Sequence, residues 1–240
     1  MPIFRIDNRI VLFAHVPKSG GTTVNHRLRE ANHALAFFDG TFWTSGKQRW
    51  FRSSPQHITN ADRDLLFTAD FYDYSFAVVR DPIQRFLSAF NHNRGRIGYW
   101  VSLPRFLSRM ERRVAARDDY FGYQFDNHFV PAARIVPPDA RVFRLEDGLD
   151  AVFAALEQDL GIIPPPEVGL ENQRSYEVAP GASPLRSVIK KLISSPSLKS
   201  HLLTDDQLER IRILYREDIQ RFYPETAPLR TVLGVERNAI

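Results

Sequence analysis

The sequence predicts one α/β domain in which helices flank a central, mostly parallel sheet. Two apolar runs of strand length, Ile10–His15 and Phe76–Val79, are each followed by a polar turn and then by a helical pattern. Recurring strand–loop–helix units favour parallel strands, and ligands bind at the carboxyl ends of such strands. The length of 240 residues suits a single domain, and we expect its core over about residues 10–223.

The first half of the chain supplies both of these units. After Ile10–His15 a helix is expected over Thr22–Ala34, where apolar residues recur at helical spacing. After Phe76–Val79, Asp81 can cap a helix whose first residue is Pro82. Between the two units we expect a short strand, a loop and a short helix, over Leu35–Phe38, Thr41–Asn60 and Asp62–Phe67 respectively.

The second half adds a third strand and further helices. An amphipathic pattern predicts a helix over Pro104–Arg117, and a short apolar run predicts a strand over Arg141–Leu145. Another helix is expected over Leu149–Leu160, followed by a helix-terminating glycine. Residues 180–203 include a stretch rich in Ser and Pro, which indicates a mobile loop with a short helix at Val188–Ile193.

The last helix carries the clearest boundary signals. Thr204 and Gln207 form a capping box at its start, and Pro224 ends it. One face is apolar throughout, which predicts a single continuous helix packed on the core. The apolar residues are Leu208, Ile211, Leu214, Tyr215, Ile219 and Phe222.

Composition excludes several classes of protein. Hydrophobic residues make up 43% of the chain and charged residues 25%, which is typical of a globular protein. The absence of cysteine excludes disulfides, cysteine–zinc sites, iron–sulfur clusters and thiol nucleophiles. No apolar run approaches the length of a membrane span, and no signal-peptide pattern is present, so we expect a cytoplasmic protein.

The charge pattern suits an anionic small molecule or a glycan. The formal net charge is +4, and 27 of the 32 basic residues are arginine, whose forked donors match phosphate, sulfate and carboxylate groups. No block of five or six basic residues, RNA-binding fingerprint or zinc-finger spacing occurs in the sequence. We therefore expect no nucleic-acid partner.

The sharpest local signal is the segment HVPKSGGTT, which begins at His15 and joins the first strand to the first helix. Two glycines let the backbone curl around an anion, and the helix N-terminus adds its positive end. A Walker A loop has its lysine after the last glycine, whereas Lys18 precedes both glycines here. A plain Gly-Gly turn is the alternative. The candidate phosphate-binding residues are Lys18, Ser19, Gly20, Gly21, Thr22 and Thr23.

A second motif, AVVRDPIQRFLSAF, spans Ala77 to Phe90 at the end of the second strand. Arg80 can form a forked contact with a phosphate, while Ser88 can donate a hydroxyl from the following helix. The alternative is a capped helix beside a surface arginine. Together with the first loop, the motif favours a second phosphate site.

Both motifs resemble a known family. The PKSGGTT loop is similar to the 5′-phosphosulfate loop of sulfotransferases that use 3′-phosphoadenylyl sulfate (PAPS). The particular residues of this loop resemble those of the carbohydrate sulfotransferases, a group that includes the heparan 2-O and chondroitin-type enzymes and their bacterial relatives. The second motif resembles their 3′-phosphate segment. The resemblance implies a P-loop-like domain, PAPS as co-substrate and 3′,5′-ADP (PAP) as product, with no metal required.

The resemblance also implies roles for individual residues. Lys18 would meet the charge that builds on the leaving phosphate, and the backbone from Ser19 to Thr23 would hold the 5′-phosphate. Arg80 and Ser88 would hold the 3′-phosphate. A nucleotide-contacting loop would include Asn172, Arg174 and Ser175.

The general base must be a histidine or a carboxylate. His57 lies between the two motifs, where the related glycan enzymes carry a catalytic histidine. His128 is the second choice, because its segment resembles a family stretch near the acceptor, where Asp126 and His128 would bind or deprotonate the substrate. A structural role remains open for each histidine.

The resemblance implies a carbohydrate hydroxyl as the acceptor. Arg105 and Arg109 belong to a basic helix stripe that could bind an anionic glycan, although a solvated helix face is the alternative. Residues 37–71 and 102–125 depart from the family pattern, so the sequence leaves the acceptor open, as it does the oligomeric state.

Two other functions compete with this reading. A nucleotide kinase or NTPase predicts a Walker A lysine and a magnesium-binding carboxylate, and the sequence offers neither. A non-catalytic module of the same fold would bind PAP or a glycan without transferring a group.

Overall fold

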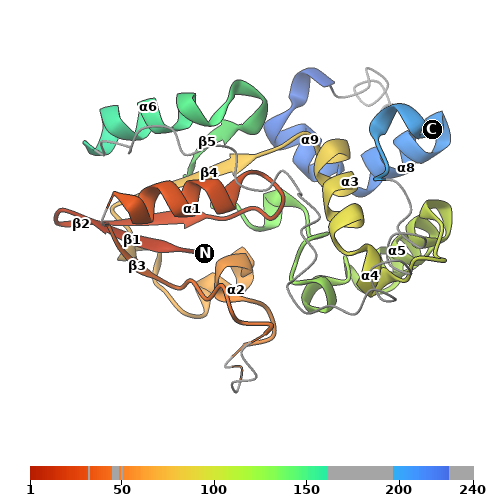
Figure 1. The fold of residues 1–240 in the computed structure, drawn as a ribbon, viewed down its shortest axis with the longest axis horizontal. Helices are drawn as coiled ribbons and strands as arrows, with labels where there is room; N and C mark the ends of the chain where they lie inside the picture. Colours follow the sequence, from red (N-terminus) through yellow and green to blue (C-terminus); the bar gives the residue numbers. More distant parts are fainter. Residues whose placement is uncertain (32, 45–48, 50, 162–196, 227–240) are drawn as a thin grey trace, which may run out of the picture.

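The computed structural model describes residues 1–31, 33–44, 49, 51–161 and 197–226. Within them, one open five-stranded sheet has the order β3-β1-β2-β4-β5 (Figure 1). The pairs β2–β4 and β4–β5 are parallel, as the sequence predicts, whereas β1 is antiparallel to β2 and to β3. The strands are β1 (Ile3–Ile6), β2 (Arg9–Ala14), β3 (Ala34–Ala36), β4 (Tyr74–Val79) and β5 (Arg141–Arg144).

The sequence analysis missed β1, which forms a hairpin with β2. Ile6 is opposite Arg9 in this ladder, so the turn has only two residues. Asp7 adopts a left-handed backbone conformation with φ of 52°, which Asp tolerates better than most residues. Asp7-Asn8 between two apolar runs was therefore a usable hairpin signal.

The helices predicted within the described residues are present, most of them with shifted ends. The side chain of Asp81 accepts a hydrogen bond from the backbone N–H of Gln84 at 2.8 Å, and the capping box of Thr204 and Gln207 is formed. The described helices are α1 (Gly21–Glu30), α2 (Asn60–Asp64), α3 (Pro82–His92), α4 (Arg94–Ile97), α5 (Leu103–Arg117), α6 (Leu149–Leu160), α8 (Asp205–Leu214) and α9 (Arg216–Phe222).

The last helix is not continuous, contrary to the prediction. It breaks at Tyr215, whose ring is fully buried and whose hydroxyl donates to the carbonyl of Phe129 at 2.7 Å. Beyond the break, Asp218 accepts hydrogen bonds from the backbone N–H groups of Ala132 and Ala133 at 2.9 and 2.8 Å. These buried contacts reorient α9, and hydrophobic periodicity does not reveal them.

The core lies on both faces of the sheet. Phe13 and Phe76 point to one face and pack with α1 and α6. Leu12 and Ala77 point to the other and join a cluster that includes α3, α5 and α8. Figure 1 shows α3, α5, α8 and α9 gathered beside the sheet, away from α6. The carboxyl ends of β2 and β4 therefore meet between helical layers.

Part of the predicted mobile loop at 180–203, including the helix at Val188–Ile193, lies outside the described residues. Its last part contacts α3. The side chain of Asn91 bonds both the N–H and the carbonyl of Leu198, at 3.0 and 2.9 Å, and Gln84 donates to Ser200 at 2.9 Å. Among the described helices, none combines the length and the apolar character needed to cross a membrane.

Candidate active site

The glycine-rich segment forms a tight loop between β2 and α1. Lys18 and Gly20 have φ of 69° and 80°, so the backbone reverses its curl twice before the helix begins at Gly21. No side chain caps α1 and no acidic residue lies in its first turn. By contrast, side chains cap α2, α3 and α8. The start of α1 thus keeps the positive end that an anion requires.

Ser19 is a second indication of a ligand at this loop. The residue is completely buried, and its hydroxyl has no hydrogen-bond partner among the described residues. A buried hydroxyl without a partner is costly, and a bound polar group would satisfy it. Thr22 and Thr23 lie in the first turn of α1, where Thr22 is exposed and Thr23 is half-buried.

Gly21 is required by the close approach of His15. A Cβ atom at Gly21 would lie 2.1 Å from both Cδ2 and Nε2 of the His15 ring. That ring stacks on Phe13, with centroids 5.3 Å apart, and meets the ring of His57 edge-on at 4.8 Å. The glycine-rich loop and the candidate base are therefore joined through one buried imidazole.

Arg80 lies at the carboxyl end of β4, as predicted, and reaches the same loop. One of its guanidinium nitrogens donates to the carbonyl of Lys18 at 3.4 Å. Ser88 is half-buried and lies two turns along α3. The hydrogen bonds of the described residues include none between Arg80 and Ser88, so a shared phosphate remains a prediction.

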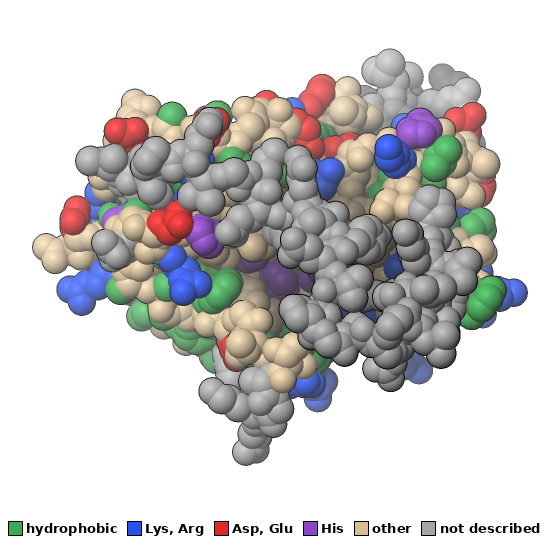
Figure 2. Space-filling view, viewed as in Figure 1, with side chains coloured by type: hydrophobic (Ala, Val, Ile, Leu, Met, Phe, Trp, Pro, Cys, Tyr) green, Lys and Arg blue, Asp and Glu red, His purple; other side chains and the backbone are tan. Residues whose placement is uncertain are grey.

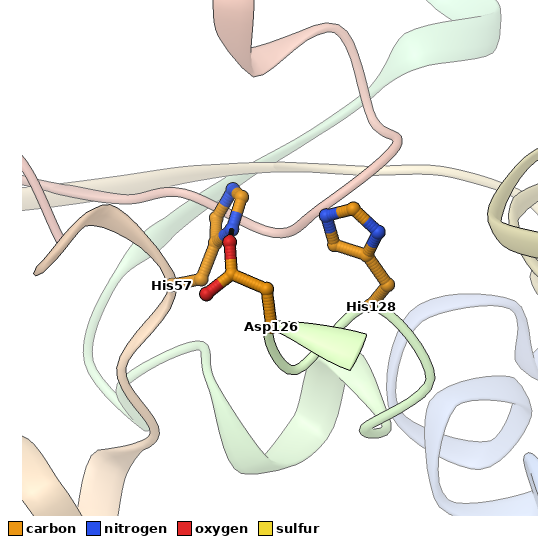
Figure 3. A group of neighbouring side chains, drawn as sticks. All are labelled: His57, Asp126 and His128. Carbon is orange, nitrogen blue, oxygen red and sulfur yellow. Dashed lines mark hydrogen bonds and ion pairs between the residues drawn. The ribbon is translucent and has the colours of Figure 1, made fainter. Parts of the chain in front are cut away.

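His57 is paired with Asp126 (Figure 3). Nδ1 of His57 donates to the carboxylate of Asp126 at 2.8 Å, and the backbone N–H and hydroxyl of Ser54 donate to the same carboxylate at 2.7 and 2.8 Å. Asn127 donates to the carbonyl of His57 at 2.7 Å. Because Nδ1 carries the proton, Nε2 keeps the lone pair that a general base needs.

The environment keeps Asp126 ionised. Burial opposes its charge, but the hydrogen bond and the charge of His57, with the Ser54 donors, outweigh burial and hold the pKa of Asp126 well below its usual value. Asp126 and Asn127 have positive φ, of 54° and 57°, which both residue types tolerate. Asp126 is thus built to orient His57 and to stabilise its protonated form.

His128, the second choice for the base, lies in the same cluster. Its ring centroid is 5.3 Å from that of His57 and 4.9 Å from that of the exposed His92. Nδ1 of His128 lies 2.9 Å from the side-chain nitrogen of Asn93. Burial, followed by the charge of His57, keeps the pKa of His128 well below its usual value, and burial does the same for His15.

His57, Asp126 and His128 also form a candidate metal-binding group. One ligand atom each from His57, Asp126 and His128 lie within 4.8 Å of one another. However, hydrogen bonds already occupy the carboxylate of Asp126 and the Nδ1 atoms of both imidazoles. These contacts suit a network that handles protons. Figure 2 shows histidine side chains near the middle of one face of the molecule.

The residues predicted for the acceptor separate into two places. Asp126 and His128 belong to the His57 cluster, whereas Arg105 and Arg109 are exposed on α5. The guanidinium of Arg109 lies 5.8 Å from the ring centre of Phe121. Asn172, Arg174 and Ser175 lie outside the described residues.

Sequence reasoning missed two polar residues of the cluster, Ser54 and Asn93. Ser54 lies three residues before His57, so its nearness in the sequence was a usable signal. Asn93 follows α3 and has no local pattern that links it to His128, 35 residues further along the chain. His92, which gave no sequence signal, also contacts His128.

Comparison with protein-family models matches residues 2–224 to the sulfotransferase family. The match spans most of the chain, and the chain belongs to this family. The class of activity is therefore transfer of a sulfuryl group. Comparison with curated proteins and with solved structures finds no match.

Proposed function

We propose that this protein is a PAPS-dependent sulfotransferase that sulfates a carbohydrate hydroxyl, with His57 as the general base. The observation that carries the proposal is the position of the His57–Asp126 pair beside the phosphate loop. The ring of His15 contacts both Gly21 of the loop and the ring of His57. A base and an anion site in this proximity suit transfer from a phosphate-linked donor.

The described residues fit PAPS. The uncapped start of α1 and the curled loop suit the 5′-phosphate, and the buried hydroxyl of Ser19 lacks a partner that a ligand would provide. Arg80, adjoining the loop, would hold the 3′-phosphate together with Ser88. PAPS supplies the sulfuryl group on a phosphate that leaves with the electrons of the broken S–O bond.

The protein's own groups then have distinct tasks. Nε2 of His57 takes the acceptor's proton as the acceptor oxygen bonds to sulfur, and Asp126 stabilises the imidazolium. Lys18 offers a positive charge at the loop for the leaving phosphate. Its closeness to the cluster is supported by its effect on the pKa of His128, which its charge helps to lower.

The carbohydrate acceptor is proposed on the resemblance of the two nucleotide motifs to carbohydrate sulfotransferases. Arg105 and Arg109, exposed on α5, offer cations to an anionic sugar.

Thermal unfolding in EDTA tests the nucleotide assignment. A ligand at 100 times its Kd stabilises the native state by about 2.7 kcal/mol, which for a chain of this size raises Tm by roughly 5–10 °C. We expect that rise with 3′,5′-ADP, and a smaller one with 5′-ADP or ATP at equal concentration. Stabilisation by ATP and Mg²⁺ without any by 3′,5′-ADP would instead support a kinase.

Arg80→Ala tests the 3′-phosphate site. Losing a charge-assisted hydrogen bond costs about 1.5–3 kcal/mol, so affinity for 3′,5′-ADP should fall about 10- to 150-fold while affinity for 5′-ADP changes little. Arg117→Ala removes the same charge from an exposed position at the end of α5 and is the matched control. An equal loss for both nucleotides in calorimetric titrations would show that Arg80 only supports the Lys18 carbonyl.

A further inference from the structure

The hydrogen bonds of Asn93 define the protonation of His128. The side-chain nitrogen of Asn93 contacts the carbonyl oxygen of Ala89 at 2.8 Å and Nδ1 of His128 at 2.9 Å. A carbonyl oxygen only accepts, so the amide atom between these two groups is the NH₂ donor. Nδ1 of His128 must therefore accept, and the neutral ring carries its proton on Nε2.

The Nε2 atoms of His57 and His128 consequently have opposite hydrogen-bonding roles, one as acceptor and the other as donor. Asp126 keeps the proton of His57 on Nδ1, which leaves a lone pair on Nε2, whereas Asn93 leaves His128 with an N–H at Nε2. In Figure 3, one ring nitrogen of His128 points toward His57, and Nδ1, next to the ring carbon that bears the side chain, points away. The N–H of His128 is thus directed to the side where His57 lies.

The surroundings keep His128 neutral. The residue is 7% exposed. Burial lowers its pKa most, the positive charges of His57, His92 and Lys18 lower it further, and only Asp126 acts in the opposite direction. Arg85 adds another cation nearby, since it donates to the carbonyl of His128 at 3.4 Å. His128 therefore stays neutral and keeps its Nε2–H as a hydrogen-bond donor.

We propose that His128 is a fixed donor to the acceptor oxygen that His57 deprotonates, and that Asn93 is the positioning residue that sets its tautomer. This inference rests on the proposed sulfotransferase function. The ring centres of His57 and His128 are 5.3 Å apart, and Figure 3 shows a ring nitrogen of His128 facing His57, so one acceptor oxygen can be placed to bond both rings. A hydroxyl there donates to His57, accepts from His128 and keeps a lone pair for attack on sulfur.

Nitrogen NMR of the histidine rings in the full chain tests the tautomer without any substrate. Between about pH 6 and pH 8, His128 should show a protonated Nε2 and an unprotonated Nδ1, with signals assigned by their loss in His128→Gln. Asn93→Asp places an acceptor at Nδ1 and should move the proton there or charge the ring. A wild-type His128 that is protonated at Nδ1, or that titrates in this range, overturns the proposal.

Activity variants test the donor role. The amide of glutamine can replace an Nε2–H donor but cannot act as a base. With radiolabelled PAPS and a panel of p-nitrophenyl glycosides, His128→Ala should lower kcat about 10²–10³-fold, as loss of a transition-state donor does, while His128→Gln stays within about tenfold of wild type. At His57, the Gln and Ala variants should be equally impaired.

The outcomes separate the two proposals. If both His128 variants lose activity equally, while melting normally and binding 3′,5′-ADP, the donor role is wrong and the sulfotransferase assignment stands. If the wild type binds no 3′,5′-ADP and transfers no label to any acceptor, the proposed function fails, and the ring NMR still decides the tautomer of His128.

Discussion

Replacing His57 by alanine is expected to lower kcat for sulfuryl transfer about 10²–10⁴-fold, which is the usual contribution of a general base. His57 is the imidazole of the cluster that a carboxylate orients, with Nδ1 2.8 Å from Asp126, so its Nε2 is the atom prepared to take a proton. Binding of 3′,5′-ADP should be unchanged, because His57 is not among the proposed phosphate contacts. The measurement is kcat with labelled PAPS, alongside the nucleotide-induced rise in Tm.

Asp126→Asn is the matched variant for the orienting carboxylate. Asparagine accepts the left-handed backbone at this position, so the loop should keep its path. Its NH₂ group can donate to Nδ1 of His57, which shifts the proton to Nε2 and removes the base. We expect kcat to fall in Asp126→Asn as it does in His57→Ala. The variant with both substitutions should have a kcat only slightly lower than that of His57→Ala. Normal transfer by His57→Ala would remove His57 from the mechanism, whereas normal transfer by Asp126→Asn would remove only the orienting role of Asp126.

The glycine-rich loop between β2 and α1 could be predicted because its signal is local. An apolar strand, a lysine, two glycines and three hydroxyls follow one another between His15 and Thr23, and the structure places them at the junction of β2 and α1. The cap at Asp81 and the capping box at Thr204 are equally local, and both are present. In each case a short run of residues specifies the backbone without help from distant contacts.

The chemistry of the histidine cluster depends on distant contacts, which the sequence does not show. His57 and Asp126 are 69 residues apart, and both were candidates, but their pairing was not predicted. The tautomer of His128 depends on Asn93, whose second hydrogen bond to Ala89 is needed to interpret the first. The break at Tyr215 likewise follows from buried partners of Tyr215 and Asp218, and not from the apolar pattern of the helix.

Gly21→Ala is expected to impair stability, nucleotide binding and transfer together. Its Cβ would lie 2.1 Å from two atoms of the His15 ring, and that ring is confined between Phe13 and His57. Overpacking of this kind costs about 1–3 kcal/mol, and the strain would be shared by the phosphate loop and the His57 ring. Urea unfolding, 3′,5′-ADP titration and kcat measure the three effects. Gly95→Ala, on α4, meets only the Tyr99 side chain at 3.5 Å or more and should leave all three unchanged.

The double variant Gly21→Ala/His15→Ala shows whether the ring contact is the cause. Removing the His15 side chain makes space for the new Cβ, so adding Gly21→Ala to His15→Ala should cost much less stability than adding it to the wild type. The two substitutions would then be coupled by about 1–3 kcal/mol, the strain that overpacking introduces. Additive effects on unfolding would contradict the argument, because they would place the cost of Gly21→Ala in the backbone of the loop. Coupling of the two substitutions, both in stability and in 3′,5′-ADP binding, would show that His15 holds the loop at Gly21 and the ring of His57 together, since its ring touches both.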